Sequence, residues 1–208
     1  MSKPLDNARL RRISKQLAKT DPHLAKVQEK YGPPPLWDRE PGFATLLHII
    51  LEQQVSLASA KACFDKLTAR LGHVTPETLL TLDDAELKAV GFSRQKTAYG
   101  RHLAEALIEQ RIDLERFYRL ADAEVKSELI ILKGVGEWTS DIYLLMVLLR
   151  PDIMPKGDIA LHAAWSELSG EPKPSSDEFL VIAERWRPYR SVAARMLWHF
   201  YLSERGRS

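Results

Sequence analysis

The chain has 208 residues, of which 45% are hydrophobic and 28% are charged, and its formal net charge is +2. These totals are ordinary for one globular domain, and so small a net charge does not by itself indicate a nucleic-acid partner. The single cysteine, Cys63, excludes an internal disulfide and any site that needs several thiolates. The N-terminus lacks the apolar core of a signal peptide and no apolar run is long enough to span a bilayer, so we expect no membrane partner.

Helical periodicity dominates the first half of the chain. The proline run at 33–35 cannot be helical and predicts a turn or an extended connector. Gly72 and Gly91 are typical of helix ends, and Thr75 before a proline is typical of a helix start. With these boundaries we expect helices over residues 5–19, 22–31, 43–54, 56–71 and 94–109, and two shorter ones that begin near residues 75 and 82.

The second half of the chain continues the same pattern. Helices are predicted over residues 114–120, 123–129, 137–149, 158–168, 177–186 and 190–204. No β-hairpin, repeat or low-complexity tract interrupts them, so the sequence predicts an all-α fold of short helices joined by tight turns. Basic residues gather in the first thirty positions and again after residue 184. One face would be basic if the two ends pack together, but solvated helix surfaces explain these residues equally well.

Two glycines, one residue apart, lie between helical segments in the sequence Leu-Lys-Gly-Val-Gly-Glu-Trp-Thr at 132–139. Glycine allows positive φ and a close approach of the backbone to another group. Gly136 leads into a helix N-terminus, whose N–H groups form a ready site for an anion such as a phosphate. A plain corner between two helices, without a ligand, accounts for the same pattern.

Asp158 stands directly before an apolar helical segment, so its ordinary role would be a helix N-cap. A carboxylate in that position is also fixed in place and stabilised by the helix dipole. A structural cap and a chemical role are therefore compatible at this residue.

Four segments, taken in order, carry a resemblance to a known family. They are Ile-Ile-Leu-Glu-Gln-Gln-Val-Ser at 49–56, the glycine hairpin at 132–139, Met-Pro-Lys-Gly-Asp-Ile-Ala at 154–160, and Trp-Arg-Pro-Tyr-Arg-Ser at 186–191 followed by Trp198. Together they resemble the helix-hairpin-helix (HhH-GPD) DNA glycosylase superfamily, and the last segment resembles its 3-methyladenine DNA glycosylase II branch. The resemblance covers most of the chain from Phe43 onward.

This resemblance implies a single domain over 1–208, built from two helical lobes with a DNA-binding cleft between them. One lobe would hold about residues 1–55 and 151–208, and the other about residues 56–150 with the hairpin at 132–139. The hairpin would grip a DNA phosphate without reading the base sequence. No catalytic metal is implied, although a monovalent cation could sit at the backbone carbonyls of the hairpin. The implied DNA-binding residues are Lys133, Gly134, Val135, Gly136, Thr139, Gln53, Gln54, Ser56, Arg190 and Ser191.

Two of these assignments carry alternatives. Gln54 matches the residue that fills the gap left by a flipped base, but it would also be ordinary as a polar residue at a helix end. Arg190 and Ser191 would either contact a phosphate or brace the last helix.

By resemblance, Asp158 is the catalytic residue. Cleavage of an N-glycosidic bond builds oxocarbenium character on the sugar. A fixed carboxylate can stabilise that charge and orient or deprotonate the attacking water. Bifunctional relatives place a Schiff-base lysine where this chain has Trp138, so base removal without strand cleavage is expected.

The damaged base is expected to bind in an aromatic pocket. Alkylated purines such as 3-methyladenine and 7-methylguanine can carry positive charge, and electron-rich rings attract cations. Trp138 and Trp198 match the pocket tryptophans of the alkyl-base branch, although core packing is the usual fate of tryptophan on an apolar helix. Tyr143 is a third pocket candidate, one place beyond the family's tyrosine position, where this chain has Ile142.

No cofactor is expected, and one cysteine cannot hold an iron–sulfur cluster. The expected partner is double-stranded DNA that contains alkylated bases, bound by a monomer. The expected location is the cytoplasm or nucleoid of a bacterium, or the nucleus of a eukaryote. Two other interpretations stay open: a glycosylase for uracil, a mismatched base or an oxidised base, and a non-catalytic DNA-binding module that uses the same hairpin.

Overall fold

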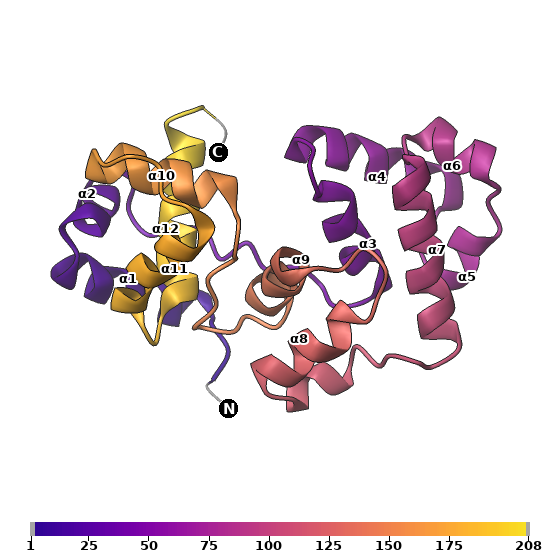
Figure 1. The fold of residues 1–208 in the computed structure, drawn as a ribbon, viewed down its shortest axis with the longest axis horizontal. Helices are drawn as coiled ribbons and strands as arrows, with labels where there is room; N and C mark the ends of the chain where they lie inside the picture. The colour runs from indigo at the N-terminus through magenta and orange to yellow at the C-terminus, as the bar shows by residue number, and fades with distance from the viewer. Residues whose placement is uncertain (1–2, 207–208) are drawn as a thin grey trace. The chain divides into compact units, whose positions relative to one another are not determined.

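The computed structural model describes residues 3–206, and within that range it contains helices and no strand. The chain folds into two compact units (Figure 1). The first unit combines the residues up to Asp38 with those from Leu144 onward, and the second runs from Arg39 to Tyr143. Among the described helices, none is both long enough and apolar enough to cross a membrane. The prediction of an all-α fold is confirmed.

The first unit is built around its last helix, α12 (Arg190–Ser203). This helix packs against α1 (Asn7–Thr20), α2 (Pro22–Tyr31) and α10 (Ile159–Ser169). Every residue of α12 from 191 to 198 is buried, so its first half is surrounded by other elements. The remaining elements of this unit are α11 (Ser176–Ala183) and the 3₁₀ turn η3 (Glu184–Trp186).

The second unit has α3 (Phe43–Glu52) inside it, against α4 (Leu57–Leu71), α7 (Arg94–Ile108) and α9 (Glu137–Ile142). Seven of the ten residues of α3 are buried, as its apolar sequence predicts. Its other elements are α5 (Pro76–Leu80), α6 (Asp84–Val90), the 3₁₀ turn η1 (Arg116–Arg119) and α8 (Asp122–Ile130).

Local capping residues determine where most helices begin. The hydroxyl of Thr75 accepts a hydrogen bond from the N–H of Thr78, and Ser93 caps α7 by accepting one from Lys96. Gly72 ends α4 with a φ of +74°, a conformation that glycine adopts without steric cost. The boundaries predicted from these residues are confirmed to within about two positions.

Two predicted helices are wrong in type. Over 114–120 the structure has only the turn η1, which ends at Leu120 in an extended conformation, although the carboxylate of Asp113 accepts bonds from the N–H groups of Glu115 and Arg116 as an N-cap does. The helix expected over 137–149 is α-helical only to Ile142 and continues as the π-helical segment η2 (Tyr143–Val147). Residues 139–145 are all buried, so hydrophobic periodicity could not distinguish the two helix types.

The boundaries of the two units differ from those expected. Residues 39–55 were expected to lie with the two chain ends, and residues 144–150 with the hairpin. Instead α3 belongs to the second unit, because its buried face packs on α4 and α7, and the chain from Leu144 belongs to the first. A backbone hydrogen bond of 2.8 Å from Leu5 N–H to the carbonyl of Leu149 supports that second placement.

Candidate functional site

The two glycines of the hairpin serve different purposes. Gly134 has a φ of +83°, and a Cβ added there would lie 2.2 Å from the ring of Tyr99. This position therefore requires glycine for conformation and for space. Gly136 has extended backbone and an added Cβ would meet no atom within 4 Å. It is the N-cap of α9 and no side chain caps the helix there, while Val135 between the glycines is buried.

The hairpin is held from outside by side chains of α7 and the end of α3. The amide of Gln53 donates to the carbonyl of Gly134 and to the hydroxyl of Thr139, both at 2.7 Å. The N–H of Lys133 donates to Nδ1 of His102 at 3.2 Å. Gln53 and Thr139 were expected to bind DNA, but Thr139 is only 2% exposed and both side chains bond to each other. In this structure they brace the hairpin, and their DNA-binding roles stay predictions.

Sequence reasoning missed the bracing roles of Tyr99 and His102. Both residues lie on α7, more than thirty positions before their partners, which are Gly134 for Tyr99 and Lys133 for His102. No local pattern marks them, because the contact depends on how α7 packs beside the hairpin.

The turn after α3 is exposed and partly apolar. Gln54 has a φ of +58°, which is unusual for a residue other than glycine. The neighbouring Val55 and Leu57 are 45% and 57% exposed. Ser56 is exposed and caps α4 by accepting a hydrogen bond from Ser59 N–H at 3.1 Å. The structure gives Gln54 and Ser56 the accessibility that a DNA-contacting turn needs, and their DNA-binding roles stay predictions.

Asp158 is the N-cap of α10, as its position in the sequence predicts. Its Oδ1 accepts hydrogen bonds from the N–H groups of Ala160 and Leu161, both at 3.0 Å, and from the indole N–H of Trp198 at 3.2 Å. The residue is 8% exposed. Three N–H donors on one oxygen fix the direction of this carboxylate.

His162 lies one helical turn after Asp158 and is buried. Its ring is tilted against Phe179, with centroids 4.9 Å apart. Burial lowers the pKa of His162, and the nearby charge of Asp158 opposes that shift only in part. The imidazole is therefore neutral at neutral pH and adds no positive charge beside the carboxylate.

The three aromatic pocket candidates differ in surroundings. Trp138 is half-buried in the first turn of α9. Trp198 is 8% exposed, and its indole N–H donates a hydrogen bond to Asp158. Tyr143 is completely buried and packs edge to face on Phe117, with centroids 6.0 Å apart. Burial raises the pKa of Tyr143. A fully enclosed ring cannot receive a base, so the pocket role expected for Tyr143 does not fit this structure.

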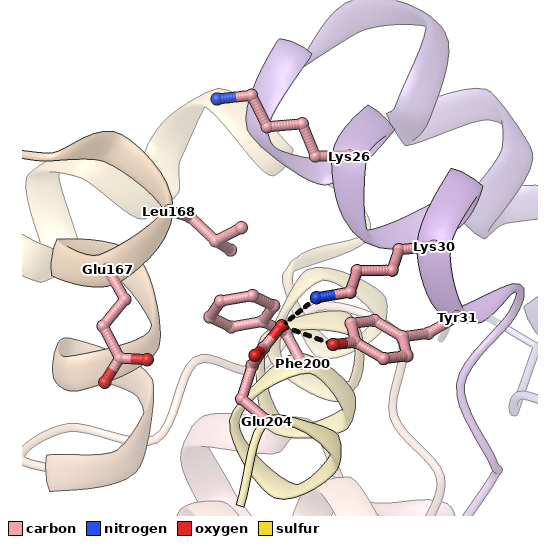
Figure 2. A pocket seen from close by; sticks show the side chains of 7 residues that line it. All are labelled: Lys26, Lys30, Tyr31, Glu167, Leu168, Phe200 and Glu204. Carbon is pink, nitrogen blue, oxygen red and sulfur yellow. Dashed lines mark hydrogen bonds and ion pairs between the residues drawn. The ribbon is translucent and has the colours of Figure 1, made fainter.

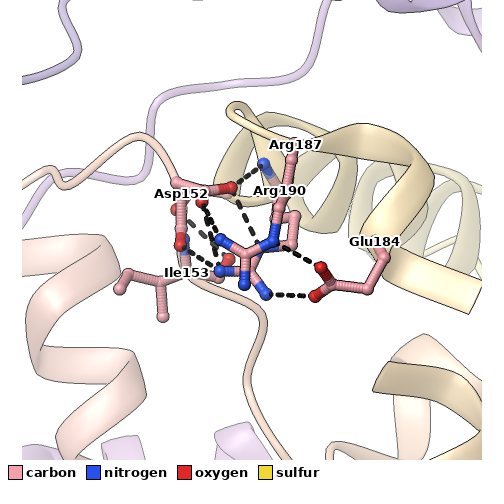
Figure 3. A network of polar contacts seen from close by, with 6 residues as sticks. Asp152, Ile153, Glu184, Arg187 and Arg190 are labelled. Atoms are coloured by element: carbon pink, nitrogen blue, oxygen red, sulfur yellow. Dashed lines mark hydrogen bonds and ion pairs between the residues drawn. The ribbon is translucent and has the colours of Figure 1, made fainter. Parts of the chain in front are cut away.

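Arg190 and Ser191 also have structural contacts. The guanidinium of Arg190 bonds Asp152 through Nε at 2.9 Å and Glu184 through Nη1 at 2.9 Å (Figure 3). Arg187 joins the same network by pairing with Asp152. Ser191 is completely buried, and its hydroxyl accepts from the N–H of Ile153 at 2.8 Å. Of the two alternatives for this segment, bracing of α12 is the one that these contacts support, and a phosphate contact stays a prediction.

The two basic chain ends do meet, because α1 and α12 are in contact. The C-terminal arginines are largely neutralised, however: Arg187 and Arg190 pair with acids, and Arg205 pairs with Glu167. On α1 the exposed cations form no ion pair with any described residue; they are Arg11, Arg12, Lys15 and Lys19. The basic surface of the first unit is therefore concentrated on α1.

A pocket of about 240 Å³ lies between α2, α10 and α12, apart from every predicted site residue. Figure 2 shows Lys30 and Tyr31 both directed at Glu204, which accepts a hydrogen bond from each. Of the charged residues that line this pocket, Lys30 and Glu204 thus pair with each other, and Glu167 pairs with Arg205 outside the lining. Within residues 3–206 no three His, Cys, Asp or Glu side chains gather closely enough to hold a metal ion.

Comparison with known proteins identifies the family. Residues 47–188 match the HhH-GPD superfamily base excision DNA repair protein family. YfjP of Bacillus subtilis is 27% identical over 184 residues, which cover 84% of this chain and 64% of that protein. DNA-3-methyladenine glycosylase 1 of Schizosaccharomyces pombe is 29% identical over 180 residues, which cover 84% of this chain and 79% of the relative.

A solved structure is similar over nearly its whole length. The Schizosaccharomyces pombe 3-methyladenine DNA glycosylase Mag1, in complex with abasic DNA, superposes with a TM-score of 0.83 at 26% identity. The superposition covers 93% of this chain and 97% of Mag1. Together with the match over 47–188, which contains both the glycine hairpin and Asp158, this establishes that the chain belongs to the HhH-GPD superfamily of base excision DNA repair proteins.

Proposed function

We propose that this protein is a monofunctional DNA glycosylase that removes alkylated purines, such as 3-methyladenine and 7-methylguanine, from duplex DNA and leaves an abasic site. The similar proteins of Schizosaccharomyces pombe named above are 3-methyladenine DNA glycosylases, which supports the substrate class. The observation that carries the proposal is the carboxylate of Asp158, held at the start of α10 by two backbone N–H groups and one indole N–H.

The chemistry follows from that carboxylate. The purine must leave the base stack before its bond to the sugar can be reached. As that bond lengthens, positive charge develops on the sugar, and the fixed anion of Asp158 stabilises it. The same oxygen atoms can orient a water and accept its proton when it attacks the sugar carbon. A cationic alkylated base is already a good leaving group, so this mechanism needs no strong general acid and no cofactor.

Strand cleavage is not expected. A lyase reaction needs an amine that forms a Schiff base with the sugar, and the family position for that lysine holds Trp138. Lys156 is the lysine nearest to Asp158 in sequence, and it forms an ion pair with Asp177 at 3.2 Å. Borohydride should therefore trap no covalent complex between the protein and an abasic-site duplex. A trapped complex that disappears in Lys156→Gln would overturn the monofunctional assignment.

Duplex DNA would be held by the hairpin, with the backbone near Gly136 facing a phosphate. Gln54, in an exposed turn, would fill the gap that the flipped base leaves in the duplex. We propose that the protein acts as a monomer.

The decisive experiment measures release of free 3-methyladenine and 7-methylguanine from methylated duplex DNA by the wild type and by Asp158→Asn. We expect the substitution to lower the single-turnover rate by about 10²–10⁴-fold, because the amide keeps the cap but loses the negative charge. Strand breaks should appear only after alkali treatment.

Asp21 provides a matched control. It is also a buried N-cap: its carboxylate accepts from the N–H groups of His23 and Leu24 and from the indole of Trp186 at 2.8 Å. Asp21→Asn should change stability as Asp158→Asn does but leave base release intact. Equal loss of activity in both variants would reduce Asp158 to a structural cap. No release by a folded, DNA-binding wild type would reject the alkyl-base assignment and lead to assays with uracil and oxidised bases.

A further inference from the structure

Trp37 has a backbone conformation that large side chains rarely adopt. Its φ is +48°, in the left-handed region, and it lies in the connector between α2 and α3. The ring is only half-buried. A bulky residue keeps such a conformation only where the surrounding structure imposes it, and such residues occur preferentially at functional sites.

Arg195 holds the backbone directly before Trp37 from the core. Its guanidinium is completely buried and donates to three backbone carbonyls: Leu36 at 2.7 Å, Leu145 at 2.7 Å and Ser191 at 3.2 Å. Burial lowers the pKa of Arg195 to about 9, so it stays charged at neutral pH. The bond to Leu36 fixes the residue directly before Trp37 on the side of α12.

The ring of Trp37 is thereby directed at the residues around the candidate catalytic carboxylate. It packs edge to face on Trp198, with centroids 6.5 Å apart and an interplanar angle of 73°. It also packs on His199, at 6.4 Å and 82°. Trp198 in turn donates its indole N–H to Asp158. A partly exposed indole is thus one residue removed from the carboxylate.

We propose that Trp37 contacts the substrate, with its exposed ring surface forming one wall of the pocket for the flipped alkylated purine beside Asp158. This rests on the proposed glycosylase function. The ring of tryptophan is the best side-chain partner for a cation, and stacking is how proteins commonly hold an extruded base. Trp198 uses its polar edge on Asp158 and is almost fully buried, whereas Trp37 keeps accessible surface and can meet the base directly.

A role in positioning alone is the rival explanation, in which Trp37 acts only by supporting Trp198. The two roles separate in a double-mutant cycle. Single-turnover excision of 7-methylguanine would be measured for Trp37→Phe, Trp198→Phe and the double variant, together with thermal unfolding and affinity for an abasic-site duplex. The matched control is Trp165→Phe, since Trp165 is a buried tryptophan with edge-to-face ring contacts to His23 and Trp186.

We expect Trp37→Phe to lower the excision rate by on the order of 10-fold. Its melting temperature and its affinity for an abasic-site duplex should fall no further than those of Trp165→Phe. In the double variant, the fold-loss of excision rate should be the product of the losses in Trp37→Phe and Trp198→Phe. A double variant no worse than Trp198→Phe alone would show that Trp37 only positions its neighbour, and an unchanged rate in Trp37→Phe would also overturn the proposal. Wild-type protein that releases no 7-methylguanine would refute the proposed function itself, so the two failures are distinguishable.

Discussion

Replacing Gly134 by alanine tests whether the hairpin depends on one specific glycine. The new Cβ would lie 2.2 Å from Cδ2 and 2.3 Å from Cγ of Tyr99, distances that force one of the two groups to move. The φ of +83° adds a conformational cost of about 1–2 kcal/mol for any residue with a Cβ. Overpacking typically costs about 1–3 kcal/mol. Gly134→Ala should therefore destabilise the protein by about 2–5 kcal/mol, a large part of the stability of an ordinary domain.

The assay is urea unfolding followed by circular dichroism, with Gly136→Ala as the matched control. Gly136 has extended backbone and open space around it, so its substitution should cost about 1 kcal/mol or less, as expected for alanine at an N-cap. For affinity to an abasic-site duplex the order of the two variants should be reversed. Gly136→Ala should lose more affinity than Gly134→Ala, since a methyl group at Gly136 would stand between the backbone and a phosphate.

A second substitution separates the two costs at Gly134. Tyr99→Ala removes the ring but leaves the backbone conformation unchanged, so the double variant should recover about 1–3 kcal/mol relative to the sum of the single variants. The reasoning is refuted if Gly134→Ala is as mild as Gly136→Ala, or if removal of the Tyr99 ring recovers nothing.

Three further predictions concern the first unit. Trp198→Phe removes the indole N–H that bonds Asp158 at 3.2 Å; a hydrogen bond to a charged group contributes about 1.5–3 kcal/mol, so single-turnover excision should fall by about 10–100-fold. Because burial lowers the pKa of His162, the unfolded chain binds a proton at this residue more readily than the folded chain does. The contribution of His162 to stability should be fully present above the ordinary pKa of 6.5 and should be lost as the pH falls below that value. The urea midpoint should therefore fall less with decreasing pH in His162→Gln than in the wild type. Lys15→Glu with Lys19→Glu removes two unpaired cations of α1 and should lower the slope of log affinity for duplex DNA against log salt by up to about 2.

Each of these has a contradicting result. Wild-type excision by Trp198→Phe would mean that the indole bond does not orient the carboxylate. An identical pH profile in His162→Gln would assign the acid sensitivity to other buried groups, of which His48 and His199 also have a pKa lowered by burial. The control for the two lysines of α1 is the double variant Lys66→Glu with Lys88→Glu, which changes two exposed cations of the second unit. Its DNA affinity should be measured at the same salt concentrations. An equal change in slope for both pairs would indicate a general charge effect rather than a contact by α1.

The sequence alone determined those features that depend on neighbouring residues. Helix starts at Thr75, Ser93 and Asp158 were predictable because a cap is a hydrogen bond from a side chain to an N–H two or three positions away. The glycine hairpin and its spacing to Asp158 also lie in order along the chain, so the residues themselves were enough to indicate the family.

Only the tertiary structure decided what each candidate side chain contacts. It placed Tyr143, a candidate for the base pocket, inside the core. It bonded Gln53 to the hairpin and paired Arg190 with Asp152, although the sequence positions of both also fitted a contact with DNA. The reason is that burial and partners of polar groups are set by segments far apart in the chain. Trp37 is the extreme case: its contacts with Trp198 come from a helix that begins more than 150 residues later, so no local pattern could have marked it.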